Sequence, residues 1–254
     1  MLSKKQTSWI NALKVKKYRK KQEAFLVEGE KNVAELLDSS FSILGIYALE
    51  SWINKNKYVK DIYPQIIHTI SPKELKSISN LQTPNEVAAV VQLPDTAAEK
   101  MIIEHLLKQP LKHHVLALDN IRDPGNLGTI IRIADWFGIQ QIICSPTCVD
   151  VYSPKVVQAT MGSIFHIEVV YSDLQQVFEK KGQLPVYAAL LQGDDIFEAD
   201  FSQKGFILMG NESQGIQQKY FKYMDKAITI SRKGKAESLN VAVATSIICA
   251  VACR

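Results

Sequence analysis

Residues 115–132 read VLALDNIRDPGNLGTIIR, an apolar strand pattern that passes through a tight turn into a helix. Asn126 stands where a helix N-cap is expected, and Arg132 lies within the helix. Gly125 and Gly128 allow a ligand to approach the backbone closely. Ligands of α/β sheets usually bind just beyond the carboxyl ends of strands. The stretch therefore predicts a catalytic or binding loop.

This stretch begins a regular alternation of strands and helices that continues to the end of the chain. Strand patterns cover 115–119, 141–144, 166–170, 185–191, 205–209 and 226–230, and helix patterns cover 127–137, 154–162, 173–181, 216–224 and 239–252. Such alternation predicts a parallel sheet with helices on both faces. We therefore expect an α/β domain over residues 114–254, with its ligand site at the carboxyl edge of the sheet.

Two further loops of this domain place polar residues directly after a strand. They contain Gly-Asn-Glu at 210–212 and Ser-Leu-Asn at 238–240. Taken singly, each has a structural explanation: a carboxylate favours a helix N-terminus, serine and asparagine are common caps, and Arg132 fits an exposed helix face. The helix that follows Asn240 holds no charged residue. We expect it to be buried against a partner subunit as well as against the sheet.

The N-terminal part of the chain shows a smaller α/β pattern. Residues 71–74, Ser-Pro-Lys-Glu, combine an N-cap, a proline at the first helical position and a capping box. We expect a basic arm at 1–24, a small α/β domain at 25–92 and a linker at 93–113. The linker ends at the neighbouring His113 and His114, whose side chains point to opposite faces of an extended chain, so we expect no metal site there.

The arm holds most of the basic charge. The whole chain has a net charge of +4, whereas residues 1–24 hold eight lysines and arginines against Glu23 alone, which gives a local charge of +7. Such a run is either a solvated tail or a basic helix that offers lysines to phosphate groups. Apolar residues at roughly helical spacing are compatible with a helix docked on the body of the protein: Trp9, Ile10, Leu13 and Tyr18.

Length and composition exclude some classes of protein. A chain of 254 residues with 46% hydrophobic content can bury one large core or two smaller ones. No apolar run approaches the ~20 residues of a membrane span, and the N-terminus lacks the apolar region of a secretion signal. The cysteines form two i,i+4 pairs that fit helical faces and lack nearby histidines at zinc spacing. We expect a cytoplasmic protein with reduced, buried thiols, no metal and no membrane: Cys144, Cys148, Cys249 and Cys253.

The three loops, in this order and context, resemble the three motifs of the SpoU (TrmH-type) family of RNA ribose methyltransferases, which belongs to the SPOUT superfamily. The resemblance covers residues 115–254. Residues 25–30, Phe-Leu-Val-Glu-Gly-Glu, lie in a segment similar to the RNA substrate-binding domain of that family, and the basic arm also fits. Order and spacing together make the resemblance specific, whereas any single motif is weak.

The resemblance implies a fold, a cofactor and an assembly. The C-terminal domain would contain a deep trefoil knot formed by the C-terminal segment, which periodicity does not reveal because knots are rare exceptions. The knot would bind S-adenosylmethionine mainly through backbone groups, with contacts from Gly210, Ile230 and Leu239. The protein would be a homodimer with its site at or near the interface, which gives Arg132 a role facing the partner.

The resemblance also implies transfer of a methyl group to a ribose 2′-hydroxyl of RNA. The family's functional positions match Asn126, Arg132, Glu212, Ser238 and Asn240. The family's proposed base is Arg132, but a guanidinium is almost always protonated in proteins. We therefore keep two hypotheses for Arg132: a base, or a clamp that holds the target phosphate and stabilises the emerging oxyanion. Asn126 would orient Arg132 or the ribose, and Glu212 would fix its loop.

Several positions depart from the family pattern. Ser231 and Arg232 replace a common Pro-Met, Ser213 replaces a glycine, and Gln158 replaces an arginine whose loss weakens RNA contact unless Arg232 and Lys233 compensate. These departures keep a catalytically silent RNA-binding protein as an alternative to the enzyme. A transfer RNA substrate and methylation of a base nitrogen are further alternatives. Ribosomal RNA is favoured because the pairing of the two domains resembles the ribosomal members of the family.

Overall fold

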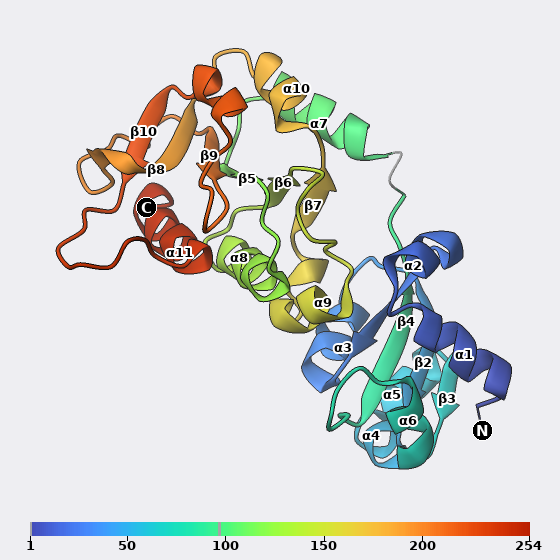
Figure 1. Ribbon diagram of the computed structural model, residues 1–254. Helices are drawn as coiled ribbons and strands as arrows, with labels where there is room; N and C mark the ends of the chain where they lie inside the picture. Colours follow the sequence, from blue (N-terminus) through green and yellow to red (C-terminus); the bar gives the residue numbers. More distant parts are fainter. Residues whose placement is uncertain (1, 96–97) are drawn as a thin grey trace. The chain divides into compact units, whose positions relative to one another are not determined.

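The computed structural model describes residues 2–95 and 98–254, which divide into two compact units (Figure 1). The first unit contains the chain up to Pro94 together with Tyr152–Phe165, and the second contains Asp95–Val151 and His166–Arg254. α9 (Pro154–Thr160) therefore belongs to the first unit, where it packs on the first strand. The first unit is thus built from two separate stretches of chain.

A four-stranded mixed sheet forms the centre of the first unit. Its order is β1-β4-β2-β3, with β2 and β3 parallel and the other pairs antiparallel. The strands are β1 (Ala24–Glu28), β2 (Ile43–Ala48), β3 (Ile67–Thr69) and β4 (Val87–Gln92). The other elements are α1 (Lys4–Ala12), α2 (Lys16–Gln22), α3 (Glu30–Leu37), α4 (Glu50–Lys55), α5 (Lys57–Ile62), α6 (Pro72–Ile78) and η1 (Ser163–Phe165). The sequence pattern missed α4 and α5, because these six-residue helices have no side-chain cap to announce them.

The capping box predicted at Ser71 is present at the start of α6. Glu74 N donates to Ser71 Oγ at 3.3 Å, and Ser71 N donates to Glu74 Oε2 at 2.8 Å. Glu74 Oε1 accepts a further hydrogen bond from Leu2 N at 2.7 Å. The backbone N–H groups of Ser71 and Leu2 lower the pKa of Glu74 to about 2. The cap of α6 therefore also fixes the start of the basic arm.

The basic arm folds into α1 and α2 and is part of the first unit. Ile10 and Leu13 are fully buried in its core, in one cluster with Leu26 of β1 and other sheet residues. Asn11 Nδ2 donates to Ser77 O at 2.8 Å, which ties α1 to α6. Of the two alternatives that the sequence leaves for the arm, the structure shows the docked helix rather than the solvated tail.

A six-stranded sheet forms the centre of the second unit, and all of its neighbouring strands are parallel, as predicted. Its order is β10-β8-β9-β5-β6-β7. The strands are β5 (Val115–Leu118), β6 (Gln141–Cys144), β7 (Glu168–Tyr171), β8 (Val186–Asp195), β9 (Phe206–Met209) and β10 (Lys226–Thr229). The apolar runs become strands because both faces of a parallel sheet are buried.

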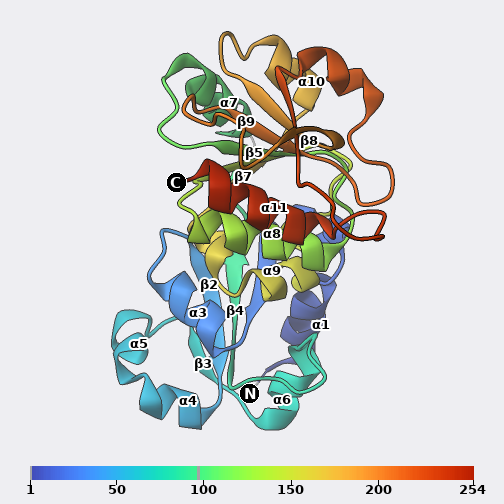
Figure 2. The same ribbon diagram turned by 90° about the vertical axis from the view of Figure 1, so that its left-hand side faces the viewer.

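Helices cover both faces of this sheet. α7 (Ala98–Lys108) and α10 (Leu174–Glu179) lie on one face, and α8 (Pro124–Trp136) and α11 (Val241–Ala252) lie side by side on the other (Figure 2). Phe178 of α10 packs in the core of the first face together with Phe206 of β9. The trefoil knot expected from the resemblance stays a prediction.

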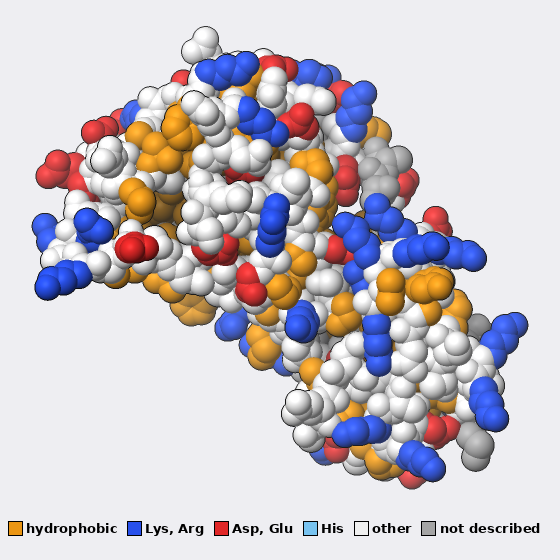
Figure 3. Space-filling view, in the orientation of Figure 1, with side chains coloured by type: hydrophobic (Ala, Val, Ile, Leu, Met, Phe, Trp, Pro, Cys, Tyr) orange, Lys and Arg blue, Asp and Glu red, His pale blue; other side chains and the backbone are white. Residues whose placement is uncertain are grey.

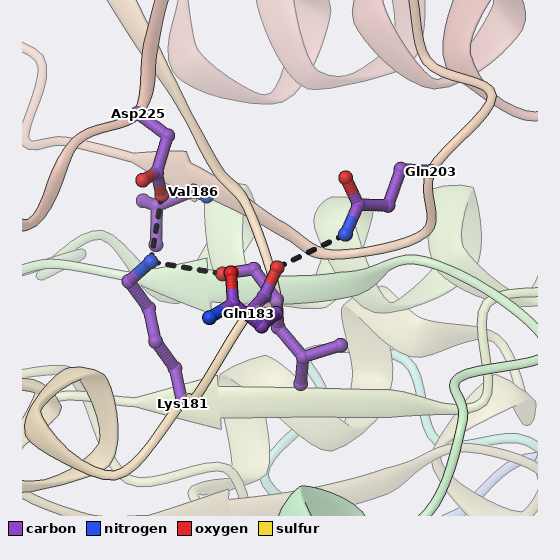
Figure 4. A network of polar contacts seen from close by, with 6 residues as sticks. Lys181, Gln183, Val186, Gln203 and Asp225 are labelled. Atoms are coloured by element: carbon purple, nitrogen blue, oxygen red, sulfur yellow. Dashed lines mark hydrogen bonds and ion pairs between the residues drawn. The ribbon is translucent and has the colours of Figure 1, made fainter.

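A polar network holds in place the starts of β8 and β10 in the same sheet (Figure 4). Lys181 Nζ donates to Asp225 Oδ2 at 2.8 Å and to Leu184 O at 2.9 Å. Asp225 Oδ2 also accepts from Val186 N at 2.8 Å. These bonds hold the segments that lead into β8 and β10, at the end of the sheet opposite to the edge expected to bind a ligand.

The start of α8 differs from the expected one. The helix begins at Pro124 rather than at 127, and its N-cap is Asp123, whose Oδ1 accepts from Asn126 N at 2.8 Å. A proline at the first helical position presets the backbone for a helix, so the cap falls directly before it. The Asn126 side chain is therefore not used as a cap.

Two other expectations for this unit are corrected. The segment expected as a helix at 216–224 is the 3-10 helix η2 (Gln218–Tyr223), which is short and has no side-chain cap. Cys144 and Cys148 do not share a helical face, because Cys144 ends β6 and Cys148 follows in a turn. All four cysteines are free thiols, and three of them are buried, while Cys253 is half-buried.

We expect Leu13→Ala to lower the free energy of unfolding by about 2–5 kcal/mol, because it removes fully buried methyl groups and leaves a cavity. Val15→Ala is the matched control, since Val15 is 51% exposed in the following turn, and its effect should stay within about 0.5 kcal/mol. Urea unfolding of the whole chain, followed by circular dichroism, measures both. Equal stabilities of the two variants would contradict a docked arm.

Candidate functional site

β5 and β9 are neighbours in the centre of the parallel sheet, so the loops that follow them meet at its carboxyl edge. Asp119, the first residue after β5, is fully buried. Its Oδ2 accepts a hydrogen bond from Gln217 N at 2.8 Å, and its Oδ1 accepts one from Gln217 Nε2 at 2.6 Å. Asn211 Nδ2 donates to the backbone oxygen of Asn120 at 3.0 Å. These contacts hold the two loops against each other.

The loop after β6 fixes the first of these loops from the other side. Asn120 adopts a left-handed backbone conformation with a φ of +60°, and its N–H donates to Ser145 Oγ at 2.9 Å. Ile121 N donates to Cys148 Sγ at 3.2 Å. A hydrogen bond with Cys144, assisted by the donors around the sulfur, lowers the pKa of Cys148 to about 7. The path of the chain into α8 is therefore set from both neighbouring loops.

The sequence patterns did not single out these supporting residues. A carboxylate at the end of an apolar strand, such as Asp119, must be paired if it is buried, so a signal was present. Its partner Gln217, however, is 98 residues further along the chain, and no local pattern identifies it. Long-range partners of this kind emerge only from the folded structure.

Three of the predicted catalytic residues form one hydrogen-bonded chain, which we call the polar triad: Glu212, Asn126 and Asn240. Asn126 Nδ2 donates to Glu212 Oε1 at 2.5 Å, and Asn126 Oδ1 accepts from Asn240 Nδ2 at 2.9 Å. Asn240 Oδ1 caps α11 by accepting from Ala242 N at 2.9 Å. The triad therefore connects α8, the loop after β9 and the start of α11.

Arg132 and Ser238 lie outside the polar triad. Arg132 is on the exposed face of α8 that also presents Thr129 and Trp136, and Trp136 is 84% exposed. Within residues 2–95 and 98–254, no hydrogen bond or ion pair involves the Arg132 side chain. Ser238 is exposed in segment 231–240, before α11. A single chain thus brings together three of the five predicted residues and leaves Arg132 and Ser238 facing outward.

The residues predicted to bind the cofactor lie in the loops after β9 and β10. Gly210 has no room for a side chain, because a Cβ atom there would lie 2.4 Å from the backbone carbon of Gly215 and the nitrogen of Ile216. Ile230 is half-buried directly after β10, and Leu239 is 46% exposed.

The loop after β10 offers free backbone groups. As far as the described residues go, segment 231–239 forms no backbone–backbone hydrogen bonds, so its N–H groups, and its C=O groups other than that of Ala236, which accepts from Arg232 Nη1 at 3.2 Å, are available to a ligand. The exposed side chain of Leu239 adds an apolar surface at the end of this segment. A cofactor that is held mainly through backbone groups fits this loop.

The departures from the family pattern leave the polar triad intact. The Ser231 hydroxyl donates to Asp195 Oδ2, which ties the loop after β10 to the end of β8, a bond that a proline has no group to form. Ser213 contributes its backbone N–H, which donates to Asn211 Oδ1 at 2.9 Å, and a glycine has the same donor. Gln158 lies on α9 in the first unit.

Neither metal ligands nor a membrane span were found in the described ranges. Within 2–95 and 98–254, no cluster of three or more His, Cys, Asp or Glu side chains is arranged to hold a metal ion. His114 is buried and His113 exposed, as their adjacent positions predict, and burial lowers the pKa of His114 to about 4. No helix of the described chain is long and apolar enough to cross a membrane.

Both parts of the sequence match models of known protein families. Residues 113–250 match the SpoU rRNA Methylase family, and residues 5–89 match the MRM3-like substrate binding domain. The chain is 32% identical over 240 residues to the 23S rRNA (guanosine(2553)-2'-O)-methyltransferase RlmP of Bacillus subtilis, an alignment that covers 93% of this chain and 91% of the relative. These matches confirm the resemblance inferred from the three loops.

Solved structures agree over the whole chain. A putative RNA methyltransferase of the TrmH family from Porphyromonas gingivalis superposes with a TM-score of 0.85 at 31% identity, over 99% of this chain and 98% of that one. An AdoMet-bound rRNA methyltransferase from Sinorhizobium meliloti superposes with a TM-score of 0.86 at 28% identity, over 99% and 96%. Sequence and structure lead to the same assignment, and the chain belongs to the SpoU rRNA methylase family.

Proposed function

We propose that this protein transfers a methyl group from S-adenosylmethionine to a ribose 2′-hydroxyl of ribosomal RNA. The polar triad carries the proposal, because it joins α8, the loop after β9 and the start of α11 at the carboxyl edge of the sheet through predicted catalytic residues. The relatives from Bacillus subtilis and Sinorhizobium meliloti are named rRNA methyltransferases, and the second was solved with AdoMet bound. These names favour ribosomal RNA over transfer RNA as the substrate.

The polar triad is suited to positioning. S-adenosylmethionine supplies a methyl group on a sulfonium sulfur, so the reaction mainly requires correct placement of the ribose oxygen. Glu212 and Asn240 bind the two ends of the Asn126 amide, which leaves one N–H of Asn126 free to orient the ribose. Segment 231–239 would hold the cofactor through its peptide groups, and Gly210 in the loop after β9 would contribute a further contact.

Arg132 is the residue that we assign to the reacting oxygen. A ribose hydroxyl is a weak nucleophile unless the charge that develops on its oxygen is stabilised. A guanidinium keeps its proton under ordinary conditions, so it stabilises negative charge better than it removes a proton. We therefore assign Arg132 the role of a clamp on the target phosphate and the emerging oxyanion, with the proton passing to phosphate or water.

A homodimer explains the outward position of Arg132. Large apolar side chains are exposed on α8 and just before and within α11, namely Trp136 (84%), Leu239 (46%) and Val243 (49%). Apolar surface of this kind marks interfaces between subunits. A second copy that covers this surface would bring its own Arg132 to the polar triad of the first. A cytoplasmic location accords with the four free cysteines and with an RNA substrate.

We expect Arg132→Ala to lower methyl transfer by about 10²-fold or more, because a preorganised charge at the oxyanion is lost. Arg132→Lys should retain part of the activity, since the positive charge remains. Incorporation of tritiated methyl groups into ribosomal RNA measures transfer, and calorimetry with S-adenosylmethionine verifies that cofactor binding is unchanged. If Arg132→Ala keeps most of its activity with the cofactor bound, both the clamp and the base are wrong.

The alternative of a catalytically silent RNA-binding protein is tested by the same calorimetry on the unmodified chain. Absence of binding at millimolar S-adenosylmethionine would favour that alternative. Methylation of a base nitrogen would be revealed by digestion of the product, because a 2′-O-methyl group blocks alkaline cleavage at its nucleotide.

We expect a mixture of Arg132→Ala and Asn126→Ala chains to regain activity that neither variant has alone. If Arg132 acts across a dimer, mixed dimers contain one intact site with Asn126 from one subunit and Arg132 from the other. Denaturing and refolding the two variants together allows subunits to exchange, and refolding each separately before mixing is the control. An inactive mixture whose dimers have demonstrably exchanged would place Arg132 in the site of its own chain.

We expect Gly210→Ala to reduce methyl transfer by about 10²-fold, because the added methyl group collides with Gly215 and Ile216 and moves the loop that carries Glu212. Binding of S-adenosylmethionine, measured by calorimetry, should weaken in parallel. Urea unfolding of the variant separates this local effect from loss of the fold. Unchanged cofactor binding and transfer would contradict the assignment of this loop to the site.

A further inference from the structure

A groove lies on the surface of the first unit between α1 and α2. It has a volume of about 510 Å³ and is lined by Lys5, Ser8, Trp9, Ala12, Tyr18, Lys21 and Gln22. Figure 3 shows lysine and arginine side chains gathered beside an exposed hydrophobic patch over these two helices. The groove belongs entirely to the basic arm and is separate from the residues assigned to methyl transfer.

The two aromatic side chains of this groove are only partly covered by the protein. Ile10 and Leu13 are fully buried, whereas Trp9 is 38% exposed and Tyr18 is 42% exposed. Among the described residues, neither the indole N–H of Trp9 nor the hydroxyl of Tyr18 forms a hydrogen bond. The apolar residues of the arm thus form two sets. Ile10 and Leu13 pack into the core, whereas Trp9 and Tyr18 are partly exposed at the surface.

The walls of the groove are fixed before a ligand arrives. Lys14 Nζ donates to Ser79 O at 3.1 Å, which fastens the turn between α1 and α2 to the body of the unit. Arg19 is buried (3% exposed), and its Nη1 donates to Leu13 O at 2.8 Å across the same turn. A preorganised surface loses less conformational entropy on binding than a flexible tail.

The positive charge of the basic arm indicates which kind of ligand the groove binds. All seven lysines of the arm are exposed, and Glu23 is the only acidic residue among residues 2–24. Exposed aromatic faces beside ammonium groups are the combination with which proteins bind single-stranded nucleic acid, because bases stack on the rings and phosphates meet the charges. A protein partner fits less well, since lysine is depleted at the centres of protein interfaces.

We propose that the groove binds an unpaired nucleotide of the RNA, with its base stacked on Trp9 and Tyr18 and the neighbouring phosphates held by Lys5 and Lys21. This inference rests on the proposed RNA methyltransferase function, and it names the surface of the first unit that binds the RNA substrate. Stacking tolerates any base because every base has an aromatic face, so the groove recognises an unpaired segment rather than a particular sequence.

The test measures binding of a fluorescein-labelled, single-stranded decauridylate RNA to the full chain by fluorescence anisotropy, without cofactor. Trp9→Ala should weaken binding by about tenfold or more, whereas Trp9→Phe should retain most of it because a ring remains. Tyr58→Ala is the matched control, since Tyr58 is 53% exposed on α5 of the same unit, outside the groove. Circular dichroism verifies that each variant is folded.

The salt dependence separates stacking from charge. Lys5→Ala and Lys21→Ala should each reduce the slope of log affinity against log salt concentration by about one, while Trp9→Ala should leave the slope unchanged. Lys60→Ala, an exposed lysine on α5, is the control and should leave both affinity and slope as they are.

Three results would overturn the proposal: no binding of decauridylate by the unmodified chain, equal binding by folded Trp9→Ala and Tyr58→Ala, or displacement of the RNA by decaglutamate at equal concentration. The last result would assign the groove to acidic protein segments. Failure of the proposed methyl transfer is distinguishable, because it appears as absent cofactor binding or absent methyl incorporation. Decauridylate binding that depends on Trp9 supports the groove irrespective of those two measurements.

Discussion

The buried carboxylate of Asp119 is the constraint on which the candidate site depends. A carboxylate without partners is costly inside a protein, so the loop after β9 must come close enough for Gln217 to bind both of its oxygens. With the two loops held at this separation, Glu212 reaches Asn126. The hydrogen bonds between Asp119 and Gln217 at the edge of the sheet therefore align the polar triad, and no ligand is needed for this.

The site consists of a fixed part and an open part. Asn126, Glu212 and Asn240 restrain one another, whereas Arg132 and segment 231–239 are exposed and make few contacts with the rest of the described chain. The exposed groups have the charge and the peptide groups that suit the phosphate and the cofactor of the proposed reaction. Such a division suits a displacement reaction, in which the protein contributes mainly position and charge.

The features predicted correctly from the sequence are those that depend on residues close together in the chain. Apolar runs predicted the parallel sheet, and the spacing of Ser71 and Glu74 predicted a capping box, because both depend on neighbours in the chain. The sequence analysis placed the cap of α8 at Asn126, whereas the structure has it at Asp123, directly before Pro124 at the first helical position. The family motifs predicted Asn126, Glu212 and Asn240 as functional residues, but only the structure shows the hydrogen bonds between them, because these join residues too distant for periodicity to relate.

The basic arm shows why a pattern predicts burial less well than it predicts a helix. Trp9 and Ile10 are adjacent and both apolar, yet Ile10 lies in the core and Trp9 lines a groove, because a helix turns neighbouring side chains to different faces. Ile10 and Leu13 belong to the core cluster of the first unit, whereas Trp9 and Tyr18 do not. Both rings keep more than a third of their surface exposed among the lysines, and stacked bases with their phosphates match both features.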